Sequence, residues 1–302
     1  MISFVVPVYN DPEGLRDTLE SLVSQNTDID YEILPVDNNS TDCTGEVIKE
    51  FEESYPELIR AFEEKKVQSS YAARNKGVEN AKGDIICFLD ADMWVKTDYL
   101  NKISSYFKEN SEVDYIGCEV KIVNKSDSLI GRFDELNGFP VKNYLEEENF
   151  APTCCLTVRK NVFDEIGLFD NRLISGGDKE FGSRVANSNH QMAYSDNIRV
   201  FHPARDSLVS MKNKYFRIGR GNFQLLSLYE DRFKSHKVEW RNLPYFWWEN
   251  LTKGIFTPKE SFDSTDGNEV DGVIEKLIIS ICLMVKEISY LAGYHYEKLR
   301  RP

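Results

Sequence analysis

Short apolar segments alternate with helical patterns over the first 95 residues, and this alternation limits the folds open to the chain. The segments SFVVPVY (residues 3–9), YEILPVD (31–37) and DIICFLD (84–90) are short and almost continuously apolar, which is typical of buried strands. Helical patterns separate them, for example over residues 43–54 and 71–83. Strands that alternate with helices predict an α/β fold on a mainly parallel sheet.

Cap and turn residues indicate where several of these elements begin and end. Asp11 suits an N-cap and Pro12 the first helical position after the first strand. Gly83 is expected to end the helix of residues 71–83 in a left-handed conformation. Residues 57–63 (ELIRAFE) are expected to form a third strand.

The second half of the chain has a more mixed pattern. Strands are expected at residues 154–160 and 192–202, and helices at 178–188 and 207–221. Residues 258–272 are polar and rich in turn formers, which predicts a loop before a C-terminal helix over about residues 273–300.

Polar residues follow three of the predicted strands directly, at residues 7–9, 37–39 and 90–92. In an open parallel sheet, ligands bind in the crevice beyond the carboxyl ends of the strands. The three groups are therefore expected to meet at one edge of the sheet and to form a ligand site there.

The third of these groups, Asp90-Ala91-Asp92, places two carboxylates at the end of one strand. Two such charges about 5 Å apart repel by roughly 3 kcal/mol at an effective dielectric constant near 20. A divalent cation removes that repulsion, and Mg²⁺ and Mn²⁺ both accept carboxylate oxygens. A solvated acidic turn is the alternative, and this short motif alone does not decide between the two.

Composition excludes some classes of function. The net charge of −13 disfavours a nucleic-acid-binding surface, which needs clustered Lys and Arg. The six cysteines include no CxxC pair, which favours reduced thiols, and no signal peptide is recognised. The most apolar run, residues 277–285, would be about 14 Å long as a helix, so no membrane span is expected.

Taken together, VVPVYN (residues 5–10), VDNNSTD (36–42), ARNKG (73–77) and DAD (90–92) resemble, in order and spacing, the nucleotide-sugar half of family 2 glycosyltransferases with the GT-A fold. The resemblance extends over about residues 2–220. It implies a Rossmann-like, mainly parallel central sheet flanked by helices, with a C-terminal helical extension. It also implies an inverting transfer from a nucleoside diphosphate sugar, with Mn²⁺ or Mg²⁺ as cofactor.

The resemblance implies a role for each matching residue. Asp37 would contact the base, Arg74 would lie near the diphosphate, and Asp90 would contact the ribose or the donor sugar. The full set of residues that would contact the nucleotide and donor sugar is Pro7, Tyr9, Asn10, Asp37, Asn39, Arg74, Asp90 and Ala91. Asp92 would bind the metal. His202, in VFHPAR, matches a late histidine that meets the metal or the diphosphate.

On the acceptor side, SGGDKEFGSRV (residues 175–185) resembles the family's Gly-rich loop followed by an acidic pair. Gly177 occupies the first acidic position, so Asp178 alone would act as the base that accepts the proton of the acceptor hydroxyl. Further candidates for acceptor-side residues are Trp94, Gly176, Gly177 and Glu180.

These assignments predict a catalytic domain over residues 1–220, with a nucleotide-sugar half (1–95) and an acceptor half (96–220). Residues 221–302 would form a helical extension that contacts a membrane or an oligomer partner. A hexosyltransferase that uses a UDP sugar for glycan or glycolipid assembly is expected, with a glycan or polyprenyl-phosphate-linked acceptor. A sugar-phosphate nucleotidyltransferase and a non-catalytic nucleotide-sugar-binding protein are the alternatives.

Location and assembly are less constrained by the sequence. Three tryptophans lie within residues 240–248, two of them in the motif YFWW (residues 245–248). This cluster suits either core packing or a membrane interface, where amphipathic aromatic residues are favoured. A cytoplasmic protein with peripheral contact at the cytoplasmic membrane face is expected, while the oligomeric state stays open.

Overall fold

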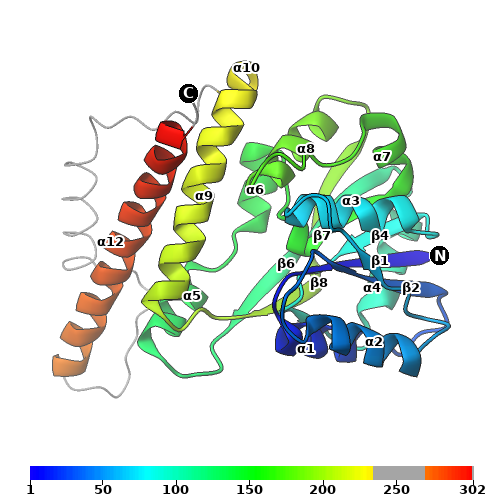
Figure 1. Ribbon diagram of the computed structural model, residues 1–302, viewed down its shortest axis with the longest axis horizontal. Coiled ribbons are helices and arrows are strands. Elements are labelled where there is room, and N and C mark those ends of the chain that lie inside the picture. The colour runs from blue at the N-terminus through cyan, green and yellow to red at the C-terminus, as the bar shows by residue number, and fades with distance from the viewer. Residues whose placement is uncertain (234–268, 301–302) are drawn as a thin grey trace. The chain divides into compact units, whose positions relative to one another are not determined.

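The structure is a computed structural model that describes residues 1–233 and 269–300. Within these residues, eight strands form one sheet in the order β3-β2-β1-β4-β7-β6-β8-β5, with helices on both sides (Figure 1). The strands are β1 Ile2–Val8, β2 Tyr31–Asp37, β3 Phe62–Glu63, β4 Ile85–Phe88, β5 Trp94–Val95, β6 Val113–Val123, β7 Leu156–Arg159 and β8 Gln191–Pro203.

The first four strands of the chain are all parallel, as the alternation of strands and helices predicts. β1 pairs with β2 and with β4, and β2 pairs with β3. The intervening helices are α1 Pro12–Val23, α2 Thr44–Ser54 and α3 Ser70–Asn80. Every residue of β1 is buried, because helices cover the sheet on both sides.

The rest of the sheet is mixed. β7 runs antiparallel to both β4 and β6, whereas β6 and β8 are parallel and β5 pairs antiparallel with β8. The helical elements of this part are α4 Tyr99–Glu109, α6 Val141–Glu148, η1 Thr153–Cys155, α7 Lys160–Ile166 and α8 Gly177–Ala186. The predicted α/β class with a GT-A-like sheet is therefore confirmed.

The chain divides into two compact units. Unit 1 comprises residues 1–123 and 138–203, and unit 2 comprises residues 124–137 and 204–302. Unit 2 contains α5 Leu129–Asn137, α9 Leu208–Leu228, α10 Glu230–Phe233 and α12 Glu269–Arg300. The predicted boundary after residue 220 falls inside α9, because this helix continues without interruption to Leu228.

Helices α9 and α12 of unit 2 approach each other closely enough to require glycine on each. A Cβ atom added at Gly219 would lie 1.9 Å from the carbonyl oxygen of Tyr290. One added at Gly293 would lie 2.0 Å from the carbonyl oxygen of Phe216. Phe133, Met211 and Cys282 form a buried apolar cluster in the same unit.

Several predicted details need correction. Helix α3 ends at Asn80 with Ala81 extended, and Gly83 does not adopt a left-handed conformation. Position 83 requires glycine for another reason, because a Cβ atom there would lie 2.8 Å from the backbone nitrogen of Ser3. The third strand is only two residues long. β5 and β6 were not predicted, although residues 118–122 of β6 alternate between apolar and charged residues.

The C-terminal helix begins before residue 273, at Glu269, so the last residues of the predicted 258–272 loop are helical. Residues 258–268 and the aromatic cluster at 240–248 lie outside the described residues. By length and composition alone, Leu277–Arg300 could cross a membrane, and 22% of its most apolar window is buried. The prediction that no segment is long enough to span a membrane considered only the shorter run 277–285. The whole helix is long enough, so the prediction is corrected with respect to length.

We expect Gly219→Ala to destabilise the protein by about 1–3 kcal/mol, because the added methyl group overpacks the crossing of α9 and α12. Gly45→Ala in α2 is the matched control, since a Cβ atom there meets nothing within 4 Å. Urea unfolding followed by circular dichroism measures both. Equal stability of the two variants would contradict the close crossing.

Candidate functional site

The strand registers bring the predicted polar groups to one edge of the sheet in unit 1. Val8, the last residue of β1, pairs with Asp37, the last residue of β2. Val5 of the same strand pairs with Phe88, the last residue of β4. Tyr9, Asn39 and Asp90 therefore follow three neighbouring parallel strands at their carboxyl ends, where the sequence places a ligand site.

The first two loops at this edge are tied together by side chains. Asn10, with φ of 51°, accepts a hydrogen bond from the backbone nitrogen of Thr41 at 2.8 Å. Its own backbone nitrogen donates to Ser40 Oγ at 3.0 Å. Asp37 is buried and accepts from the backbone nitrogen of Ser40 at 2.9 Å. Asn10 thus acts here as a loop-holding residue.

The two residues that follow Asp37 have different roles, since one is buried and the other is exposed. Asn38 is buried, and its side chain donates to the carbonyl oxygens of Glu64 and Val67. Asn39 is exposed with φ of 65°. Tyr9 is half exposed, at 50%, while Pro7 is buried within β1. Tyr9 and Asn39 are therefore available to a ligand, whereas Asn38, which sequence reasoning missed, shapes the loop.

Helix α1 fixes the turn that contains Asp90, Ala91 and Asp92. Thr18 Oγ1 donates to the carbonyl oxygen of Met93 at 2.7 Å. Gly14 allows the carbonyl oxygen of Ala91 to approach, since a Cβ atom there would lie 2.4 Å from it. Sequence reasoning missed both residues, although an early glycine in an amphipathic helix was a detectable signal.

Asp90 forms an ion pair with a buried arginine. Arg74 Nη2 lies 2.5 Å from Asp90 Oδ1, and the arginine side chain is 6% exposed against 39% for the aspartate. Burial opposes the charge of Arg74, but the charge and hydrogen bond of Asp90, together with the charges of Tyr71 and Asp178, outweigh this, so the pKa of Arg74 lies above its ordinary value. In this structure Arg74 holds Asp90 in place instead of facing solvent.

Asp92 lies beside the imidazole of His202, which comes from the end of β8. His202 Nε2 is 3.5 Å from Asp92 Oδ2. His202 Nδ1 is 2.5 Å from the carbonyl oxygen of Pro203, which can only accept a hydrogen bond, so Nδ1 carries the proton. In the neutral imidazole the lone pair of Nε2 then faces Asp92, the arrangement typical of a metal-binding histidine.

Asp92 and His202 are suited to bind a divalent cation whose remaining coordination positions are filled by a ligand. Among the described residues, no group of three or more His, Cys, Asp or Glu side chains could hold a metal without help. One carboxylate and one imidazole leave coordination positions for phosphate oxygens and water. Burial raises the pKa of Asp11, and the negative charge of Asp92 adds to this effect, so excess negative charge gathers near the pair.

Asp178 occupies the first turn of α8, next to the ring of Tyr71 from α3. The Tyr71 hydroxyl donates to Asp178 Oδ1 at 3.4 Å. A Cβ atom at Gly177 would lie 2.8 Å from the Tyr71 ring. Glycine therefore replaces the usual first acidic residue because the tyrosine ring fills that space. Gly176, with φ of 83°, is the N-cap of α8.

Tyr71 also connects Asp178 to the ion pair of Arg74 and Asp90. The Arg74 guanidinium lies over the Tyr71 ring, 5.5 Å from its centre. A continuous series of contacts therefore leads from Asp90 through Arg74 and Tyr71 to Asp178. Sequence reasoning did not single out Tyr71, because a tyrosine at the start of a helix is normally a packing residue.

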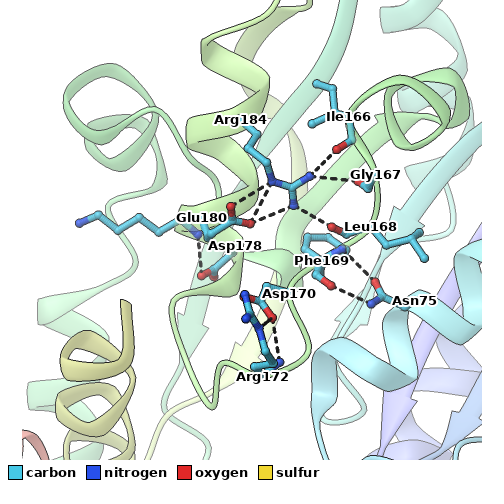
Figure 2. Close-up of polar contacts among 11 residues, drawn as sticks. Asn75, Ile166, Gly167, Leu168, Phe169, Asp170, Arg172, Asp178, Glu180 and Arg184 are labelled. Carbon is cyan, nitrogen blue, oxygen red and sulfur yellow. Dashed lines mark hydrogen bonds and ion pairs between the residues drawn. The ribbon is translucent and has the colours of Figure 1, made fainter. Parts of the chain in front are cut away.

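Glu180 is buried and forms an ion pair with Arg184 at 2.9 Å, one turn further along α8 (Figure 2). Arg184 donates to the carbonyl oxygens of Ile166 and Leu168, each at 2.7 Å. Asn75 of α3 exchanges two hydrogen bonds with the backbone of Phe169 (Figure 2). Glu180 thus supports the segment that leads to Asp178.

Trp94, the remaining acceptor-side candidate, lies in β5 and stacks on Phe201 with ring centres 5.8 Å apart. It is half-buried. Phe201 directly precedes His202, so this stacking also helps to fix the strand end that carries the histidine.

Comparison with known proteins places the chain among glycosyltransferases. It is 33% identical to the glycosyltransferase AglE of Haloferax volcanii over 239 residues, 78% of this chain and 77% of that protein. It is 28% identical over 219 residues, 68% of each chain, to a Methanococcus voltae enzyme named dolichyl N-acetyl-α-D-glucosaminyl phosphate 3-β-D-2,3-diacetamido-2,3-dideoxy-β-D-glucuronosyltransferase.

Solved structures share the fold. A mannosyltransferase of Pyrobaculum calidifontis in complex with GDP-Man and Mn²⁺ matches with a TM-score of 0.66 and 15% identity, covering 100% of this chain and 88% of that one. Residues 1–349 of S. aureus TarS in complex with UDP-GlcNAc match with a TM-score of 0.54 and 16% identity, covering 99% and 92%. Residues 3–167, more than half of the chain, match the family model Glycosyl transferase family 2, and the protein therefore belongs to that family.

Proposed function

We propose that this glycosyltransferase transfers a hexose from a nucleoside diphosphate sugar to an acceptor hydroxyl, with inversion and with a divalent metal. The observation that carries the proposal is the series of contacts from Asp90 through Arg74 and Tyr71 to Asp178. This series supports the proposal because it links the acidic residue at the start of α8 to the turn after β4, where the donor is proposed to bind.

The donor nucleotide is proposed to lie along the carboxyl ends of β1, β2 and β4. Tyr9 and Asn39 are exposed at this edge, and Asp37 lies between them in the fixed loop. A UDP sugar is the donor favoured by the family resemblance. A GDP sugar is the competing candidate, because a protein of the same fold was solved with GDP-Man. Titration with UDP and GDP in the presence of Mn²⁺ distinguishes the two.

Asp92 and His202 are the residues proposed to hold the metal. The imidazole nitrogen favours Mn²⁺ over Mg²⁺, since Mg²⁺ takes mainly oxygen ligands. A metal bound there would supply positive charge for the departing diphosphate. The chain's own contribution is to fix the imidazole through Pro203 and to keep Asp92 on the turn that α1 and Arg74 hold.

Asp178 is proposed to accept the proton of the acceptor hydroxyl as that oxygen attacks the anomeric carbon. A carboxylate is a common general base for a proton transfer of this kind. The Tyr71 hydroxyl and the backbone nitrogen of Lys179 donate to the same oxygen, Oδ1. These contacts orient the carboxylate, and attack from the side opposite the diphosphate produces inversion.

The acceptor is proposed to be a glycan or a polyprenyl-phosphate-linked sugar. The Methanococcus voltae relative is named for a dolichyl phosphate sugar, and a Bacillus spizizenii relative, 30% identical over 164 residues, is named poly(ribitol-phosphate) β-glucosyltransferase. A cytoplasmic location with peripheral membrane contact stays a prediction. Family membership decides against the nucleotidyltransferase alternative. The non-catalytic alternative is tested at Asp178, because a protein that only binds a nucleotide sugar would not need this residue.

We expect Asp92→Asn to abolish metal-dependent donor binding and His202→Ala to weaken it, with the loss larger for Mn²⁺ than for Mg²⁺ because a nitrogen ligand is removed. Calorimetric titration of UDP with each metal measures this. Asp84→Asn is the matched control, because the Asp84 side chain is 89% exposed at the other end of β4. Unchanged metal dependence in both site variants would contradict the metal assignment.

We expect Asp178→Asn to reduce transfer by about 10² to 10⁴, the usual contribution of general base catalysis, because the amide cannot accept the proton. Donor affinity should stay within about twofold, since the nucleotide contacts lie on other elements. Turnover and donor binding are measured on the same variant. A collapse of donor affinity would place Asp178 on the donor side, and unchanged turnover would remove its role as the base.

We expect Tyr71→Phe to lower kcat about three- to tenfold without changing donor affinity, since one hydrogen bond to the Asp178 carboxylate is lost while the ring contacts remain. Steady-state kinetics measure the effect. Tyr55→Phe, an exposed residue after α2, is the control. Equal kinetics for the two variants would show that the Tyr71 hydroxyl does not orient the base.

A further inference from the structure

The first turn of α8, which carries Asp178, begins with two glycines and needs contacts from other elements to fix it. Gly176 is the N-cap, with φ of 83°, and Gly177 is the first residue of the helix. Glycine has more backbone freedom than any other residue, so ordering this turn costs much conformational entropy. Tyr71 holds one side of the turn, with its ring beside Gly177 and its hydroxyl on Asp178.

Lys179, the residue after Asp178, connects the same turn to α6. Its ammonium group forms an ion pair with Glu148, the last residue of α6, and lies 5.6 Å from the centre of the Phe150 ring. The side chains of Lys179 and Glu148 are 14% and 31% exposed, so the pair is partly shielded from water. Solvent screens such a pair less than a surface pair, so we expect it to hold α8 and α6 together.

Packing around this ion pair makes the end of α6 a fixed support. The Phe150 ring stacks on Tyr144 of α6, with ring centres 5.2 Å apart and an angle of 18° between the rings. One turn further along α8, Gly182 lets the backbone approach, since a Cβ atom there would lie 2.4 Å from the carbonyl oxygen of Asn149. The start of α8 is therefore held from the α6 side as well as from the Tyr71 side.

We propose that Lys179 is a positioning residue for the base of the transfer reaction. Its backbone nitrogen donates to Asp178 Oδ1 at 3.0 Å, while its side chain binds Glu148. The direction of the hydrogen bond to the carboxylate therefore depends on where α6 holds Lys179. Burial raises the pKa of Tyr144, and the negative charges of Glu148 and Asp178 add to this, so both carboxylates lie near one phenol. This role rests on the proposed function, in which Asp178 accepts the proton.

Turnover in two backgrounds tests whether Lys179 acts through Asp178. We expect Lys179→Met, which keeps a long side chain without the charge, to lower kcat about three- to tenfold, because a displaced base transfers the proton more slowly. KM for the donor should stay within about twofold. In the Asp178→Asn background the same change should have almost no effect, since the base is already absent. An equal loss in both backgrounds would overturn the proposal, because it would show a purely structural role.

The readout is release of nucleoside diphosphate from UDP-GlcNAc or GDP-Man with Mn²⁺, since transfer to water requires the same base but no identified acceptor. Glu148→Gln on α6 is the second variant if Lys179→Met does not fold, and the same loss is expected. Lys142→Met is the matched control, because Lys142 and Glu146 form an ion pair on the same helix with side chains 59% and 61% exposed. Equal kinetics of this control and of both pair variants would overturn the proposal.

Hydrogen exchange followed by mass spectrometry tests the connection between α8 and α6 without turnover. The backbone nitrogens of Lys179 and Glu180 donate to Asp178 Oδ1 and to the carbonyl oxygen of Gly176, at 3.0 and 2.9 Å. We expect peptides with these amides to exchange about three- to tenfold faster in Lys179→Met and in Glu148→Gln, and at an unchanged rate in the control. Unchanged exchange in both pair variants would overturn the proposal.

Failure of the proposed function has a different signature. If Asp178→Asn keeps full turnover, Asp178 is not the base, and the role proposed for Lys179 is overturned with it. If instead Asp178→Asn loses turnover while Lys179→Met acts equally in both backgrounds, the proposed function stands and only the positioning role is overturned.

Discussion

The ion pair between Arg74 and Asp90 joins the two halves of the candidate site. Arg74 reaches from α3, which packs against β1 and β2, to the turn after β4. Its guanidinium lies over the Tyr71 ring, and Tyr71 in turn contacts Asp178. Because Arg74 is buried, its charge requires Asp90, and the position of the turn after β4 is therefore coupled to the helix whose Tyr71 contacts Asp178.

Loss of Asp90 and loss of Arg74 are expected to have unequal effects on stability. Removing one member of a buried ion pair costs about 3–5 kcal/mol when the other stays buried without a counter-charge. Loss of the Asp90 carboxylate leaves Arg74 in that position, whereas loss of Arg74 leaves an aspartate that is 39% exposed and can be solvated. Substitutions at Asp90 therefore change folding as well as ligand binding. Asp92 lies beside His202 and outside this pair, so its substitution tests the proposed metal site more directly.

The parallel half of the sheet and its ligand edge could be predicted from sequence, because continuous apolar runs and the following polar groups reflect local physics. The N-cap role of Asp11 and the place of Pro12 at the start of α1 could also be predicted from sequence. The roles of Tyr71, Thr18 and Gly14 were not, since each depends on a contact more than 70 residues away in the chain. Glu180 was matched by position, but its partner Arg184 shows that it supports α8 and the preceding loop.

The two units balance their charges in different ways. In unit 1 the buried Arg74 and the half-buried Arg184 each have a carboxylate partner within 3 Å. In unit 2 Arg220 is matched in the same way by Glu297, yet Lys214 shares Asp134 with Arg205 at longer distances. Within unit 2, the pair of Arg220 and Glu297 therefore joins α9 to α12, whereas Asp134 holds the segment that leads into α9.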